Sequence, residues 1–236
     1  MLMTLKAMSA LLSYPTPDLK DAIGEIKKVL VGEAILPATT IDALTPLFNQ
    51  LEEDDIYDLQ ERYVSLFDRS RTLSLNLFEH VHGESRDRGG AMVDLLETYR
   101  AGGFEPVSAE LPDHLPALLE FLATRPVSEA QETLSDAAHI LESLRIRLGR
   151  RESDYGAVFD ALMKFCGQKV DDLVVAELLK HEDDDPDDLE ALDAVWEESE
   201  VTFGPDPNAG CPQVRDMLSQ MDLPVNPAPA RPAAAE

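Results

Sequence analysis

Apolar residues along the chain recur at steps of three and four, the spacing of one helix face, and seldom alternate with polar residues as they would in a strand. One expected helix begins at Thr16 and Pro17, a favoured N-cap followed by a favoured first-turn residue. Its apolar face predicts four buried side chains: Leu19, Ile23, Ile26 and Leu30. The helix that precedes it ends before Pro15, because the residue ahead of a proline avoids the helical region.

The same spacing predicts helices through most of the chain. They are expected at 40–51, 54–67, 91–99, 154–165 and 170–179. Capping residues mark two more: Asp113 caps a helix with Pro116 in its first turn, and a capping box from Ser128 opens a long helix that runs to about Arg150. Residues 68–90 are polar and least periodic, so they read as an irregular connection. The pattern predicts an all-α fold, a single multi-helix, bundle-like domain.

The composition changes after Glu182. Acidic residues crowd together without Lys or Arg up to Glu200, although Leu189, Leu192 and Trp196 keep a helical spacing that favours a short acidic helix. Pro and Ala dominate the chain end. We therefore expect an all-helical domain over 1–203 and an acidic, Pro/Ala-rich, disordered C-terminal tail over 204–236.

The charge of the chain excludes several functions. Its 236 residues hold 20 Lys+Arg against 46 Asp+Glu, a net charge of −26. Such a surface repels nucleic acid and anionic membranes, whereas a basic or apolar peptide remains a suitable partner. Tyr14-Pro15 stands where a signal peptide needs small residues, and no apolar run is long enough to span a membrane. With only Cys166 and Cys211, the expected compartment is the cytoplasm.

The densest group of chemically active residues lies between Phe78 and Gly89. His80, His82 and Glu84 are metal-ligand types, but on a helix the two histidines point to different faces, and no H-E-x-x-H motif is present. The same residues offer acid–base groups without a nucleophile motif. Two other interpretations remain open: a polar network that holds the connection against the bundle, and a ligand-binding loop.

Two further segments are candidates. Glu110 to Pro116 is explained adequately as a helix start, and the stripe of Tyr63, Leu66 and Phe67 reads by itself as core.

Three motifs together resemble one known family. They are Tyr63-x-x-Leu66-Phe67-Asp68, the run Leu77-Phe78-Glu79-His80-Val81-His82-Gly83-Glu84-Ser85-Arg86-Asp87-Arg88-Gly89, and Glu110-Leu111-Pro112-Asp113-x-Leu115-Pro116. They are similar to the nitrate reductase delta subunit (NarJ-type) family of molybdenum-cofactor assembly chaperones. The resemblance covers most of the chain up to about Gly204, and the second motif is long and unusual.

The resemblance implies an all-helical, cytoplasmic chaperone that is not an enzyme and carries no cofactor of its own. Its partner would be the apo catalytic (alpha) subunit of respiratory nitrate reductase, chiefly the N-terminal peptide, with cofactor-insertion proteins as further partners. It would keep that subunit open until the molybdenum cofactor is inserted and would coordinate docking to the membrane anchor, without entering the membrane or binding nucleic acid.

The resemblance also implies a client-peptide site. Its residues are expected to be Tyr63, Leu66, Phe67, Glu79, His80, His82, Arg86, Arg88, Glu110, Pro112, Asp113 and His114. Leu111 is inserted between the Glu and Pro of the loop found in related chaperones. Two alternatives stand beside the chaperone: a metal-dependent enzyme that uses His80, His82 and Glu84, and a structural subunit that stays in the reductase.

Overall fold

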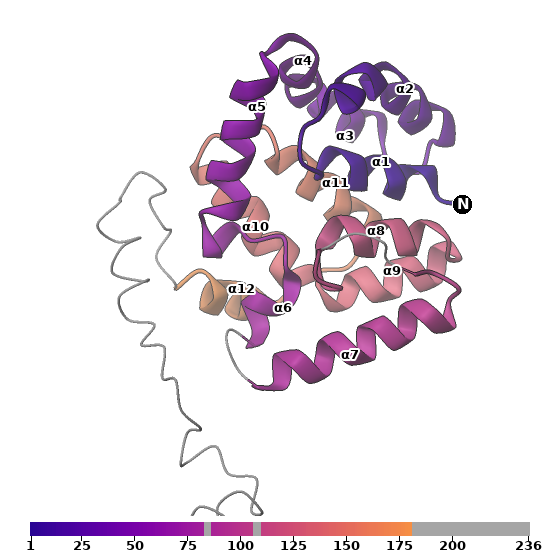
Figure 1. Cartoon of the computed structure of the whole chain (residues 1–236), viewed down its shortest axis with the longest axis vertical. Helices are drawn as coiled ribbons and strands as arrows, with labels where there is room; N and C mark the ends of the chain where they lie inside the picture. Colours follow the sequence, from indigo (N-terminus) through magenta and orange to yellow (C-terminus); the bar gives the residue numbers. More distant parts are fainter. Residues whose placement is uncertain (83–85, 106–109, 181–236) are drawn as a thin grey trace, which may run out of the picture. The chain divides into compact units, whose positions relative to one another are not determined.

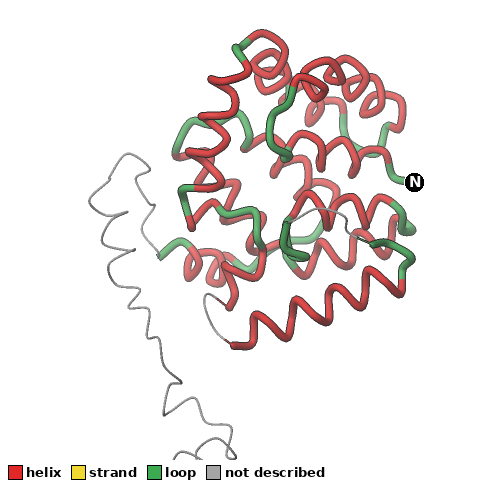
Figure 2. The backbone as a smooth tube through the Cα atoms, in the orientation of Figure 1, coloured by secondary structure: helices red, strands yellow, loops and turns green. Residues whose placement is uncertain are grey.

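Short helices joined by tight turns make up the part of the chain that the computed structural model describes, residues 1–82, 86–105 and 110–180 (Figures 1 and 2). All of these residues belong to one compact unit, Met1–Asp188. Within them there is no β-strand, only an isolated antiparallel bridge between Asn76 and His114. The expected all-α fold is confirmed. The boundary at 203/204, the acidic helix and the tail lie outside the described residues.

The helices follow one another closely along the chain. They are α1 (Met3–Leu11), α2 (Pro17–Glu33), α3 (Ala38–Ala43), α4 (Thr45–Glu53), α5 (Ile56–Tyr63), α6 (Leu77–His82), α7 (Arg86–Ala101), α8 (Leu115–Ala123), α9 (Val127–Asp136), α10 (Ala138–Arg150), α11 (Gly156–Cys166) and α12 (Asp172–Leu178). A π-helical segment, Val64–Asp68, extends α5, and a 3-10 turn, Arg71–Leu73, follows it. Within the described ranges, no helix is both long and apolar enough to cross a membrane.

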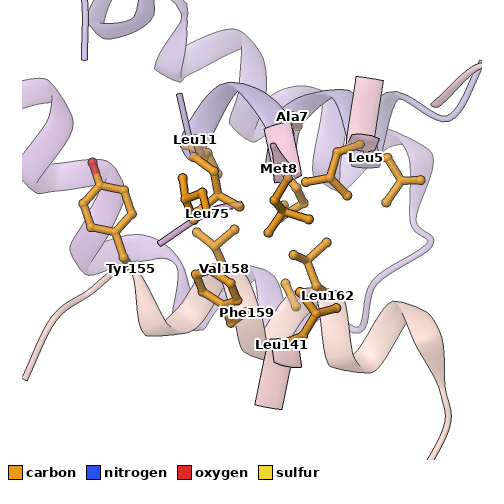
Figure 3. Close-up of a cluster of buried hydrophobic side chains, with 14 of the residues drawn as sticks. Leu5, Ala7, Met8, Leu11, Leu75, Leu141, Tyr155, Val158, Phe159 and Leu162 are labelled. Atoms are coloured by element: carbon orange, nitrogen blue, oxygen red, sulfur yellow. The ribbon is translucent and has the colours of Figure 1, made fainter. Parts of the chain in front are cut away.

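The core is built around α1. Its leucines face α11, and Figure 3 shows Leu5, Met8 and Leu11 pointing toward Val158 and Leu162, with Leu141 of α10 beneath. These side chains are almost fully excluded from solvent. Burying an aliphatic side chain of this size contributes about 1.5–3 kcal/mol to stability. Because α1 packs on α11, residues from both ends of the described chain share this core.

The start of α2 is confirmed in detail. The Thr16 hydroxyl accepts a hydrogen bond from the Leu19 N–H at 3.2 Å, and Pro17 occupies the first turn. All four side chains predicted to be inward on this helix are buried.

Several boundaries differ from the sequence prediction. Residues 40–51 form two helices that meet at Leu44, and the expected connection over 68–90 holds α6 and the start of α7. The long helix to Arg150 is broken at Ala137, close to where Ser135 donates its hydroxyl to the Gln131 carbonyl, a local bond that competes with a regular helix. In α12 the buried residue is Val175.

The predicted capping box is also wrong. Helix α9 begins at Val127, so Ser128 lies inside the helix, and Pro126 precedes the helix without a side-chain cap. Proline is compatible with this position because it needs no hydrogen-bond partner for an N–H group.

Candidate functional site

A cavity of about 780 Å³ opens between α1, α2 and the start of α8. We call it the α1 groove. It is lined by Met3, Lys6, Ala7, Ser9, Ala10, Ser13, Tyr14, Thr16, Leu19, Ala22, Glu25, Ile26, Val29, Tyr63, Asp68, Glu110, His114, Pro116, Ala117 and Glu120.

Hydrogen bonds to α1 fix the walls of the groove. Ser9 donates its hydroxyl to the Pro116 carbonyl at 2.8 Å, and the Leu2 N–H donates to the Ala123 carbonyl at 2.6 Å, so α1 and α8 run antiparallel. At the other wall, Glu33 at the end of α2 accepts from the N–H groups of Met3 and Thr4. Because α1 begins without a side-chain cap of its own, this carboxylate satisfies its free N–H groups.

The groove has an apolar floor and an acidic rim. Alanines 7, 10, 22 and 117 line it, and such small side chains let another helix approach closely. Its acidic residues are Glu25, Asp68, Glu110 and Glu120. Among the described lining residues, Lys6 is the only Lys or Arg, and it lies 3.7 Å from Glu120 in a half-exposed ion pair. The lining therefore suits an apolar helix with basic residues.

Tyr63 anchors one end of the groove. Its hydroxyl donates to the Leu12 carbonyl at 2.9 Å, and its ring meets Tyr14 edge-on at 5.6 Å between centroids. Burial raises the pKa of Tyr63, and the nearby carboxylates of Asp68 and Glu110 raise it further, so the phenol stays protonated as a donor.

Three titratable groups surround that tyrosine. Burial raises the pKa of Asp68, and the charge of Glu110 adds to this effect. Burial also lowers the pKa of His114. This effect outweighs the charges of Glu110, Asp113 and Asp68, which would raise that pKa. The imidazole is thereby kept neutral, so this end of the groove is negatively charged.

The structure brings together only some of the residues predicted for the site. Tyr63, Glu110 and His114 line the groove. Leu66 and Phe67 belong to the core, where the Phe67 ring packs edge-on against Tyr155 at 5.1 Å.

The predicted cap at Asp113 is wrong. This side chain is fully buried, and its Oδ2 accepts from the Phe78 N–H at 2.9 Å, while the N-cap position of α8 belongs to His114. The adjacent Pro112 carbonyl accepts from the Tyr99 hydroxyl at 2.7 Å. The loop expected to bind a client therefore holds α6 and α7 in place with its second half.

Within the cluster between Phe78 and Gly89, the residues that the structure describes form polar contacts. His80 bonds through Nε2 to the Ser74 carbonyl at 2.8 Å, and burial lowers its pKa, so the ring is a neutral donor. Glu79 lies 3.6 Å from Arg71. Arg88 on α7 has a buried Nε atom without a hydrogen-bond partner.

The described part of this cluster gives no support to a metal site at His80, His82 and Glu84. His82 ends α6 and Arg86 begins α7, but their side chains and all of Glu84 lie outside the described residues. Among the side chains that are described, none form a group of three or more His, Cys, Asp or Glu able to hold a metal ion.

Sequence reasoning missed most of the groove. The walls from α1 and α2, and the acids Asp68 and Glu120, were not predicted as site residues. One signal was present: Ala7 and Ala10 on α1, followed by Ser13 just past its end, form a stripe of small residues beside the leucines of the helix.

Residues 16–161 match the family model described as the nitrate reductase delta subunit, which is more than half of the chain. The chain belongs to the nitrate reductase delta subunit family. The chain is 47% identical over 205 residues, 86% of each protein, to the nitrate reductase molybdenum cofactor assembly chaperone NarJ of Escherichia coli K12. It is 40% identical over 207 residues, 88% of this chain and 86% of the other, to NarW of the same strain, named a probable chaperone of the same kind.

A solved structure agrees with this family. A crystal structure from Archaeoglobus fulgidus, provisionally named a redox enzyme maturation protein, superposes with a TM-score of 0.52 at 26% identity and covers 71% of this chain and 94% of that one. The expected resemblance is confirmed. The chain is a member of a family of assembly chaperones and not of enzymes.

Proposed function

We propose that this delta-subunit family member is a cytoplasmic assembly chaperone for a nitrate reductase. In this proposal it binds the N-terminal segment of the apo catalytic subunit in the α1 groove, holds that subunit competent for molybdenum cofactor insertion, and coordinates its docking to the membrane anchor. The cofactor is cargo of the client, and the chaperone leaves once assembly is complete. The proposed folded domain is 1–203.

The α1 groove is the observation that carries the proposal. A helix of nine residues such as α1 is about 14 Å long, so a client helix that runs alongside it would be about two and a half turns long. Helix-in-groove recognition needs an apolar stripe on the client and an apolar channel on the receptor, with charges at the rim setting orientation. The alanine floor and acidic rim provide these features for a basic, amphipathic client.

Calorimetry with the full chain tests the proposal. The client catalytic subunit's N-terminal peptide is titrated in, with a scrambled peptide as control. We expect saturable binding of the native peptide alone, with a negative heat-capacity change from buried apolar surface. Absence of binding across pH and salt would remove peptide recognition from the proposal.

A matched pair of variants on α2 locates the binding. Ala22 lines the groove and is half-buried, so Ala22→Phe fills the channel and should weaken peptide binding at least tenfold. Val31 is 65% exposed and lies outside the groove lining, so Val31→Phe should leave binding unchanged. Equal effects of both variants, with intact helical content, would place the site elsewhere.

A separate measurement addresses the retained-subunit alternative. Active reductase purified from cells that make this chain should lack it, whereas the apo catalytic subunit captured before cofactor insertion should carry it. Stoichiometric chain in the active enzyme would favour a structural subunit.

A further inference from the structure

The α1 groove has two chemically different ends. The Lys6 end lies beside the first half of α1, where Lys6 and Glu120 line it. The Tyr63 end lies beside the end of α1, where Tyr63, Asp68, Glu110 and His114 line it. The bonds from Leu2 to Ala123 and from Tyr63 to Leu12 fix which end is which.

The acid at the Lys6 end already has an internal cation. Glu120 lies 3.7 Å from Lys6. This pair is about half exposed, so it contributes little to stability, but it cancels charge close to the groove. The Lys6 end therefore exerts little net attraction on a cation.

Acids at the Tyr63 end are not balanced in this way. Within the described residues, Asp68 and Glu110 make no ion pair with Lys or Arg. Their like charges repel, since Glu110 raises the pKa of Asp68. The neighbouring imidazole of His114 is kept neutral by burial, which lowers its pKa. A cation arriving here relieves a repulsion instead of breaking an existing pair.

We propose that the α1 groove binds its client helix in one direction, with the client's N-terminus at the Tyr63 end facing Asp68 and Glu110. This inference rests on the proposed function, because it takes the occupant to be an N-terminal peptide. The free α-amino group and the positive end of the helix dipole coincide at that terminus. The client helix thus runs antiparallel to α1 and leaves the groove at the Lys6 end.

Helix dipoles of the chaperone do not reverse this preference. Helices α2 and α8 also begin near the Tyr63 end, and each N-terminus carries about half a positive charge. In α2 that charge is partly offset by the Thr16 cap and by Asp18 in the first turn. Two full carboxylate charges at the groove outweigh what remains.

A double-mutant cycle with the client's amino group tests the direction. The probe is the client N-terminal peptide, made once with a free amino group and once N-acetylated, and titrated calorimetrically at neutral pH into the full chain. Three proteins are compared: the native chain, Asp68→Asn/Glu110→Gln, and Glu120→Gln. The amides keep the volume of the carboxylates, and the cycle cancels any effect of acetylation on the peptide's own helicity.

The expected result is specific to one end. Relative to the native chain, Asp68→Asn/Glu110→Gln should reduce the preference for the free amino group by about two- to fivefold, the size of a partly exposed charge pair. Glu120→Gln should keep the native preference. Coupling of acetylation to the Glu120 variant alone means the opposite direction and overturns the proposal, as does coupling to neither variant. Failure of the native chain to bind either peptide overturns the proposed function itself.

Discussion

The hydroxyl of Tyr63 donates a 2.9 Å hydrogen bond to the main-chain carbonyl of Leu12, and this bond ties the end of α5 to the end of α1. Leu12 is the C-cap residue of α1, so its carbonyl has no partner within the helix. The tyrosine of the first family motif thus has two roles. It completes a helix end in the core, and it lines the α1 groove.

Tyr63→Phe should separate these roles. Removal of the hydroxyl leaves the buried Leu12 carbonyl unsatisfied, so the free energy of unfolding should fall by about 1–2 kcal/mol in a urea titration. The ring remains, so peptide affinity should change less than threefold. Tyr57→Phe on the same helix is the control, because Tyr57 is 76% exposed. Equal stability of both variants would show that the hydrogen bond contributes nothing.

Glu33→Ala should loosen the start of α1. Burial alone would raise the pKa of Glu33, but hydrogen bonds from Thr4 and Met3 outweigh it and lower the pKa. Loss of such a cap costs about 0.5–2 kcal/mol. Since the pKa is lowered on folding, this stability is present above the ordinary carboxyl pKa and is lost as pH falls through the folded value. Thermal melts at several pH values check this: Glu33→Ala should lower the melting temperature at neutral pH, whereas Asp21→Ala, at an exposed position on α2, should have little effect.

The fold was predictable where capping and periodicity agree. The start of α2 followed from Thr16, Pro17 and a strict apolar stripe, and the structure matches it. The predicted continuous helix fails at Ala137, where a local hydrogen bond from Ser135 to Gln131 competes with the regular helix. The predicted helix cap fails at Asp113, where a tertiary hydrogen bond uses the side chain instead. Nothing in the local sequence indicates that the Asp113 carboxylate accepts from Phe78, 35 residues away.

The site was predictable only through its motifs. Tyr63, Glu110 and His114 were expected and line the groove, whereas Leu66 and Phe67 are core residues because the helical stripe they share with Tyr63 faces inward. The α1 and α2 walls depend on contacts such as the bond from Ser9 to Pro116, which spans 107 residues of sequence. Hydrophobic periodicity carries no information on such pairings.

Acidification should destabilise the chain through His80. Burial lowers the pKa of His80 below its ordinary value of 6.5, so the unfolded chain binds this proton first. The free energy of unfolding should therefore fall as pH drops below about 6.5, by at most about 1.4 kcal/mol per pH unit for one proton. His114 acts in the same direction. Urea titrations of the native chain and His80→Gln across this range should show a shallower pH dependence for the variant, and identical slopes would contradict the assignment.

Gly102→Ala and Gly24→Ala should have opposite effects on stability. A Cβ atom at Gly102 would lie 2.6 Å from Cε2 of Phe121, whose buried ring packs against Tyr99 and Phe104. Since the ring has little freedom to move, we expect a loss of about 1–3 kcal/mol. A Cβ at Gly24 meets nothing within 4 Å inside α2, so alanine there should add about 0.5–1 kcal/mol. Differential scanning calorimetry of the two variants checks both signs.

The π-helical segment Val64–Asp68 has a consequence for how this protein family could diversify. Its defining bond, from the Arg69 N–H to the Val64 carbonyl at 3.0 Å, accommodates one residue more than a regular helical turn. Loss of Val64 or Ser65 would restore a regular helical turn and rotate the rest of this segment by about 100° about the helix axis. Tyr63 would keep its place, whereas Asp68 at the groove and Leu66 and Phe67 in the core would all turn. A single deletion would thus change the charge of the proposed client groove and force the core beneath it to repack.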